Sequence, residues 1–183
     1  QWSIRPYVST GLFDPDEPLR YEIGAAASAS YEITPGLTVK GTVRQRVFGN
    51  ADQDAPGDLT VDEYLALTDE QIAAGNNGVY RVRSDGRMYS GNDSPRIPEL
   101  TLNWNARPTS TVYSRVTVGL LENMYGGVSA EALWKPANSP LGFGAEINRV
   151  RKRDFDQLFD FRDYEVTTGH VSAYYEFTQG FTA

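Results

Sequence analysis

The sequence predicts an all-β protein: an antiparallel, up-and-down transmembrane β-barrel, to which these 183 residues contribute about eight long strands of an incomplete barrel. Three observations lead to this prediction. Apolar and polar residues alternate over long segments, tight turns gather at one end and longer loops at the other, and no run of about 18 apolar residues could form a membrane helix. Only alternate residues of a barrel strand meet lipid, so 40% hydrophobic residues suit a barrel wall.

Residues 37–48 show the alternation most clearly. One face of this strand would be aliphatic, and the other would carry Lys40, Arg44 and Arg46. At about 3.3 Å per residue, a strand of this length can cross a bilayer when it is tilted. The aliphatic face therefore suits lipid or a core, and the cationic face suits water or acidic partners.

Seven further segments alternate in the same way, and we expect strands at 2–13, 19–33, 97–106, 112–124, 128–135, 141–152 and 164–177. Several of these are longer than the typical soluble strand of about 5–6 residues. Short turns that contain proline should join strands at residues 34–36, 107–110 and 136–140. In an up-and-down sheet the opposite end then holds residues 14–18, 49–96, 126–127 and 153–162. This asymmetry is typical of outer-membrane barrels.

Residues 50–96 form a long loop excursion with a short helical segment. Thr60 and Thr68 each begin a capping box, with Glu63 and Gln71 at the third helical position, and Gly75 should end the second helix. Because residues 51–75 are strongly acidic, they are either a solvated excursion or a plug. Residues 79–89 must add two strands or none, and we expect none. The whole chain 1–183 is then part of one outer-membrane β-barrel domain.

Composition narrows the function classes. A net charge of −7 argues against nucleic acid as a partner, because phosphate binding favours a basic surface. The absence of cysteine excludes disulfides and thiolate metal sites. The acidic groups at 14–17 and at Asp52, Asp54 and Asp58 lack EF-hand spacing, so we expect no metal and no cofactor. Since the chain begins at Gln1 without a visible signal peptide, we expect it to be a fragment of a longer protein.

The polar faces of the strands provide the candidate site. If they line a channel, cations and aromatic rings could contact a polymer, and the candidates are Lys40, Arg44, Arg46, Tyr113, Arg115, Glu131, Glu146, His170 and Tyr174. The alternative is an internal lattice of salt bridges that uses Glu22, Glu122, Glu131 and Glu146.

Glu131 and Glu146 also allow an enzyme. Pairing across the turn at 136–140 places them opposite each other, and paired carboxylates perform acid–base work in glycosidases. Their simpler role is to neutralise nearby cations. His170 could act in a Ser-His-Asp triad only if a Ser and an Asp converged on it, and a hydrogen-bonding role on the polar face is simpler.

Several motifs resemble the YjbH family of exopolysaccharide-secretion outer-membrane proteins. The resemblance runs along most of residues 5–177 and includes 5–9, 44–50 and 161–164. Its strongest part is a loop that contains Arg151, Arg153, Asp154, Phe155, Asp156 and Gln157. We expect Arg151, Arg153 and Arg162 to pair with Asp154, Asp156 and Asp163 and to hold this loop closed.

The resemblance implies a barrel in the outer membrane of a Gram-negative bacterium that helps to export a capsule or biofilm polysaccharide. Its partners would be the secreted polysaccharide, outer-membrane lipid and other envelope components of the same system. The resemblance brings no catalytic residues, so we expect no enzyme. Two alternatives stay open: a β-rich polysaccharide-processing enzyme that uses Glu131 and Glu146, and a structural barrel or adhesin.

Overall fold

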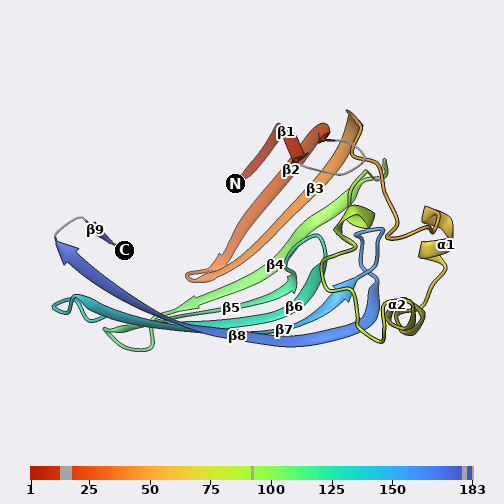
Figure 1. The fold of residues 1–183 in the computed structure, drawn as a ribbon. Coiled ribbons are helices and arrows are strands. Elements are labelled where there is room, and N and C mark those ends of the chain that lie inside the picture. Colours follow the sequence, from red (N-terminus) through yellow and green to blue (C-terminus); the bar gives the residue numbers. More distant parts are fainter. Residues whose placement is uncertain (13–17, 92, 179–180, 183) are drawn as a thin grey trace.

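A computed structural model describes residues 1–12, 18–91, 93–178 and 181–182, and its strands form one antiparallel sheet (Figure 1). The strands follow one another across the sheet in chain order. They are β1 (Trp2–Leu12), β2 (Leu19–Thr34), β3 (Leu37–Gly49), β4 (Arg96–Ala106), β5 (Val112–Leu120), β6 (Tyr125–Trp134), β7 (Leu141–Arg153), β8 (Phe161–Thr178) and the short β9 (Phe181–Thr182). The predicted all-β antiparallel meander with eight long strands is therefore confirmed, and β9 adds a strand that the pattern did not predict.

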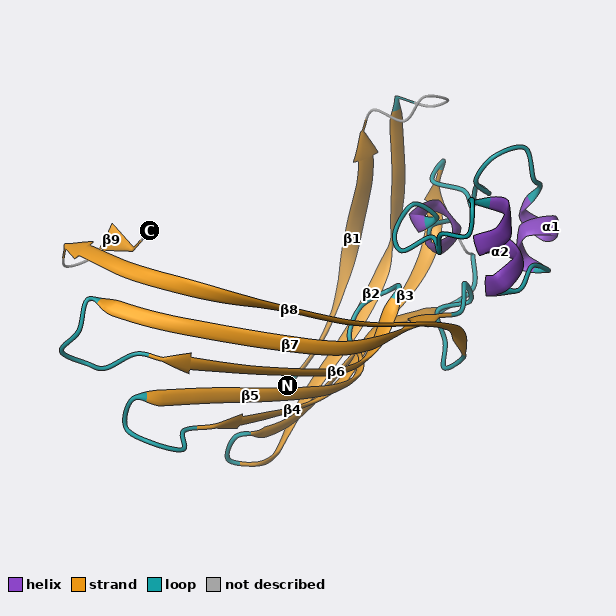
Figure 2. Ribbon diagram, turned by 60° about the horizontal axis from the view of Figure 1, so that its bottom comes forward, coloured by secondary structure: helices purple, strands orange, loops and turns teal. Residues whose placement is uncertain are grey.

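The sheet is curved and open. β1 lies at one edge and β9 at the other, and these two strands are not paired. Figure 2 shows β1 rising steeply from the sheet while β4 to β8 run across it as a trough. The strand pattern predicted from the sequence is present, but the sheet is not closed into a barrel.

The register sorts the side chains into an apolar and a polar face. Val116, for example, pairs with Trp104 on β4 and with Ala130 on β6, which in turn pairs with Ile147 on β7. The neighbouring row, Asn103, Thr117, Ser129 and Asn148, is polar throughout. Because a shift of one residue would mix the two sets, this pattern specifies the register.

The hairpin between β5 and β6 differs from the prediction. The strand expected to reach residue 124 ends at Leu120, and Gly126 and Gly127 lie inside β6 rather than in the turn. Gly119 and Gly127 pair with each other and have φ of +131° and +153°, respectively. A Cβ at Gly119 would lie 2.2 Å from the carbonyl oxygen of Leu100, so glycine permits a close backbone approach within the ladder. Gly119 lies within a strand, as expected, but the prediction of a turn at Gly126 and Gly127 was wrong, because Gly127 likewise permits a close approach to the backbone of Arg149.

The excursion between β3 and β4 contains α1 (Val61–Leu65), α2 (Asp69–Gly75) and the 3₁₀-helix η1 (Gly86–Tyr89). Both predicted capping boxes are confirmed, since Thr60 and Thr68 each accept a hydrogen bond from the third helical residue. No strand occurs in residues 79–91, as predicted. None of the helices in the described residues is long and apolar enough to span a membrane.

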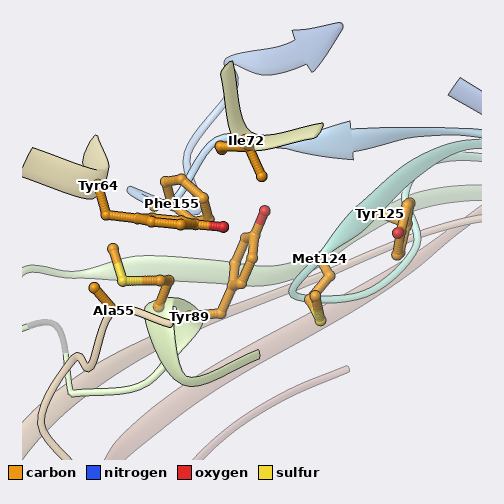
Figure 3. Close-up of a cluster of buried hydrophobic side chains, with 8 residues drawn as sticks. Ala55, Tyr64, Ile72, Tyr89, Met124, Tyr125 and Phe155 are labelled. Atoms are coloured by element: carbon orange, nitrogen blue, oxygen red, sulfur yellow. The ribbon is translucent and has the colours of Figure 1, made fainter. Parts of the chain in front are cut away.

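The hydrophobic core lies at the loop end of the sheet rather than on a sheet face. Figure 3 shows side chains of this core, which come from the excursion, the β5–β6 hairpin and the loop after β7. The buried residues of the cluster are Ala55, Tyr64, Ile72, Met88, Tyr89, Met124, Tyr125 and Phe155. Phe155 contacts the rings of Tyr64 and Tyr89, with centroids 5.7 and 5.0 Å away. This cluster holds the excursion against the end of the sheet, while most large apolar side chains of the apolar face are exposed.

Candidate functional site

A row of polar side chains crosses the sheet from β4 to β8. Asn105 pairs with Arg115, Arg115 with Glu131, Glu131 with Glu146, and Glu146 with His170. The predicted opposition of the two glutamates across the turn at 136–140 is confirmed. The antiparallel register thus brings together candidates from neighbouring strands.

Each glutamate in this row has its own partner. Arg115 forms an ion pair with Glu131. The side-chain amide of Asn148 donates a hydrogen bond to Glu146 at 2.8 Å, and Nε2 of His170 lies 3.6 Å from the other carboxylate oxygen of Glu146. The repulsion expected between opposed carboxylates is therefore offset locally.

A groove of about 350 Å³ lies along this row. Tyr113 of β5 and Tyr174 of β8 line it, and both rings are exposed. Its lining also includes Gly144, where a Cβ would lie 3.5 Å from the Tyr174 ring. The groove therefore combines aromatic and charged side chains with one lining position, Gly144, that has no side chain.

The cations of β3 do not join this groove. Lys40 forms an ion pair with Glu99 at 2.9 Å. Arg44 lies over the ring of Tyr7, 5.0 Å from its centroid. Arg46 is buried and pairs with Asp52 at 2.7 Å and with Asp93 at 3.3 Å. The four cations proposed together from the sequence thus occupy separate places, and carboxylates of the described residues pair with Lys40, Arg46 and Arg115.

Glu22, which the sequence suggested as a member of a salt-bridge lattice, lies in a buried group at the loop end of β2 and β4 whose other members the sequence did not identify. Arg96 pairs with Glu22, which also accepts a hydrogen bond from the hydroxyl of Tyr7. Arg96 and Glu22 are both buried, although 74 residues separate them. Alternation placed Glu22 on the polar face, but no local signal identified its partner.

Two buried ion pairs fasten the excursion to β7 and β8. Nζ of Lys152 lies 2.5 Å from the carboxylate of Asp85, and Nε of Arg162 lies 2.6 Å from that of Asp69. Asp69 also accepts a hydrogen bond from the backbone N–H of Tyr164 at 2.9 Å. Burial alone would raise the pKa of Asp69, but the hydrogen bond and charge of Arg162 hold this pKa below its ordinary value.

These contacts show where the excursion lies relative to the sheet. Lys152 and Arg46 belong to the polar face, so the segment that contains Asp85 and Gly91 folds against that face. The helices α1 and α2 lie beyond the strand ends (Figure 1). The acidic excursion is thus docked at the end of the sheet, with its later part on the polar side.

The loop at residues 151–157, which carries the strongest part of the family resemblance, has a mainly structural role. Arg153 was expected to pair with an aspartate, but this was wrong: its guanidinium donates to the backbone carbonyls of Glu122, Gln157 and Leu158. Fully buried, it satisfies orphan carbonyls where the chain turns. Gln157, also buried, donates to the carbonyl of Tyr89 at 2.8 Å.

The other ion pairs that were expected to close this loop are confirmed in part. Arg151 pairs with Asp163 at 3.1 Å, and Arg162 pairs with Asp154 at 3.3 Å as well as with Asp69. Asp156 instead accepts a hydrogen bond from the backbone N–H of Leu158 at 2.9 Å.

The described part of the chain contains no group of three or more His, Cys, Asp or Glu side chains that could hold a metal ion. Asp52 and Asp54 are engaged by arginines. The other acidic turn considered from the sequence, residues 14–17, lies outside the described residues.

Comparison with known protein families shows to which family the chain belongs. The family described as "Exopolysaccharide biosynthesis protein YbjH" matches residues 1–183. The chain belongs to the YjbH family. A relative in Escherichia coli (strain K12), named "Uncharacterized lipoprotein YjbH", is 29% identical over 175 residues, which cover 94% of this chain and 23% of the relative. No solved structure matches this YjbH-family chain.

The predicted resemblance to YjbH proteins is therefore confirmed. The chain is related to exopolysaccharide biosynthesis through its family. It spans less than a third of the length of its E. coli relative, because the matched region covers only 23% of that protein.

Proposed function

We propose that this chain is part of the wall of an outer-membrane β-barrel that takes part in exopolysaccharide export. The exposed apolar face of the sheet is the observation that carries this proposal. Long antiparallel strands with one apolar face suit a barrel whose outside meets lipid and whose inside is wet. The family adds the polymer, because its description names exopolysaccharide biosynthesis.

The apolar face has boundaries that fit a membrane. At the turn end it carries a band of exposed aromatic side chains: Trp2, Tyr31, Trp104, Trp134, Phe143, Tyr175 and Phe177. Near the loop end of β7 and β8, two exposed ion pairs lie on the same face: Arg149 with Glu165 at 2.6 Å and Arg151 with Asp163 at 3.1 Å. Aromatic girdles at the interfaces and an apolar band between polar ends are typical of outer-membrane barrels.

The open edges fit a wall segment. An unpaired edge presents backbone N–H and C=O groups that lipid cannot satisfy, so a sheet in a membrane must close. We therefore assign the pairing of both edges to further strands of the same longer polypeptide. The E. coli relative, of which this chain covers 23%, is long enough to provide them and is called a lipoprotein, a name that fits an envelope location.

The polar face would then line the lumen and contact the polymer. A catalytic role is less well supported, because Arg115 pairs with Glu131 and Asn148 donates to Glu146. We propose that the two carboxylates bind rather than cleave.

Two measurements test the barrel. In SDS gels, the full-length protein extracted from outer membranes should migrate faster unboiled than boiled, as a closed barrel does. A charged side chain on a face that meets lipid should also destabilise the protein. Val171 is 84% exposed in this sheet, and its replacement by Arg should cost about 2–4 kcal/mol of folding free energy in vesicles.

Thr168→Arg is the matched control, because Thr168 is exposed on the opposite face of the same strand. It should change folding by about 0.5 kcal/mol or less. If the apolar face met water, Val171→Arg would be as mild as the control. That result, together with extraction without detergent, would reject the barrel.

A further inference from the structure

We propose that the groove between Tyr113 and Tyr174 binds the hexose rings of a neutral polysaccharide and selects against polyanions. This inference rests on the proposed export function. Three features of the polar face support this assignment: the shape of the groove, the exposed tyrosine rings and the pairing of its charges.

The groove has the size and lining of a sugar subsite. Its volume of about 350 Å³ is at the lower end of ligand pockets, which span about 300–1,000 Å³, and suits one or two rings of a longer chain. Tyr113 comes from β5 and Tyr174 from β8, and both rings expose apolar surface with a polar tip. The apolar C–H faces of a hexose can pack on the Tyr174 ring and on the face of the Tyr113 ring opposite the guanidinium of Arg107, which lies 4.9 Å from the centroid of that ring.

Hydrogen-bonding groups line the same groove, two residues further along the strands from the row that contains Tyr113. An ionised carboxylate can accept about four hydrogen bonds, and Glu146 has one assigned to Asn148. It can therefore accept from the hydroxyls of a sugar, while the other N–H groups of Arg115 can donate to them. The row thus offers both acceptors and donors, as neutral sugars require.

The charges of the groove disfavour an anionic polymer. Arg115 and Glu131 neutralise each other, and Glu146 then leaves the row negative when His170 is neutral. Nearby, Lys135 pairs with Glu176 at 3.3 Å, and on β3 Lys40 pairs with Glu99. A uronate or sulfate brought into the groove would face Glu146 while these cations already have carboxylate partners, and such like-charge contacts are unfavourable.

The test uses full-length protein in detergent micelles and neutral hexose hexamers of glucose, galactose or mannose, compared with a uronate hexamer of equal length. Calorimetric titration should show a neutral hexamer binding at least about tenfold more tightly than the uronate. Tyr174→Ala should weaken the neutral hexamer about tenfold, the usual cost of truncating a central aromatic contact. Glu146→Gln should reduce the discrimination by raising uronate affinity.

Tyr175→Ala is the matched control. Tyr175 adjoins Tyr174 but lies on the apolar face, where its ring contacts Phe177 with centroids 4.8 Å apart. This variant should bind the hexamers like the native protein. Tighter binding of the uronate, no binding of any neutral hexamer, or equal effects of the two tyrosine changes would overturn the proposal.

The gel-mobility assay separates this inference from the barrel proposal. If the native protein and Tyr174→Ala both show a heat-modifiable band but neutral hexamers do not bind, only the sugar site is rejected. If the native protein shows no such band, the barrel proposal fails whatever the sugar result.

Discussion

Lys152→Met should release the excursion from the end of the sheet while leaving the sheet intact. The Lys152 and Asp85 side chains are 4% and 0% exposed, and the Lys152 ammonium also donates to the carbonyl of Arg81 at 2.5 Å. Removing the cation leaves a buried carboxylate without its ion-pair partner, which costs about 3–5 kcal/mol. The undocked population of the excursion should therefore rise roughly 10²–10⁴-fold.

Hydrogen exchange of the full-length protein measures this population directly. Amides of residues 61–89 should exchange faster by about that factor, whereas those in the middle of β6 and β7 should keep their protection. Lys152→Met combined with Asp85→Leu should recover most of the protection, because an apolar pair of similar volume can replace a buried ion pair.

Arg83→Gln is the control for a charge lost from the same excursion. Its pair with Glu122 joins side chains that are 63% and 41% exposed, so its loss should cost less than about 1 kcal/mol. Equal effects of Lys152→Met and Arg83→Gln would refute the reasoning that burial decides the strength of the attachment. Loss of protection throughout β6 and β7 would show that the excursion and the sheet unfold together.

Two further changes test other parts of the fold. Because Arg162 lowers the folded-state pKa of Asp69, this carboxylate stabilises docking at neutral pH, and the contribution is lost as pH falls below about 4 through that lowered pKa. Proteolysis of the excursion by an acid-active protease should accelerate in that range, and Asp69→Asn should show a smaller pH dependence and weaker docking at neutral pH. Gly119→Ala should destabilise the sheet by more than about 1 kcal/mol in urea unfolding, because its φ is +131° and a Cβ would meet the backbone of β4. Gly86→Ala, where a Cβ meets nothing within 4 Å, should be nearly neutral, and similar losses for both glycines would contradict the strain argument.

Local patterns predicted the sheet well. Strand pairing keeps the two-residue period along most of the sheet, with register shifts only in the β2–β3, β3–β4 and β7–β8 ladders among the eight long strands. Alternation therefore located the long strands and the opposition of Glu131 and Glu146. The capping boxes at Thr60 and Thr68 were equally local, because each needs residues only three positions apart. Gly127 was misassigned because a glycine in a turn and a glycine at a close backbone approach have the same sequence signal.

The docking of the excursion could not be predicted in the same way. The composition of this segment shows that it is acidic, but it does not show which cations pair with its carboxylates. Asp69 pairs with a residue 93 positions later, and Asp85 with one 67 positions later. Both carboxylates are consequently buried, although an acidic segment suggests a solvated surface. The size of the groove likewise depends on several strands packed side by side, which no single segment reveals.

The long separations of these contacts also set an order of events during folding. The excursion precedes β4 in the chain, yet the cations that pair with its buried carboxylates, Lys152 and Arg162, belong to β7 and β8. These two ion pairs cannot form until the chain through Arg162 has been synthesised and the β7–β8 hairpin has formed. Contacts this distant in sequence form late, since closing the intervening chain has an entropic cost. A docked excursion therefore marks a sheet in which the β7–β8 hairpin is in place, and an assembly factor that recognised it would distinguish such a sheet from one that lacks this hairpin.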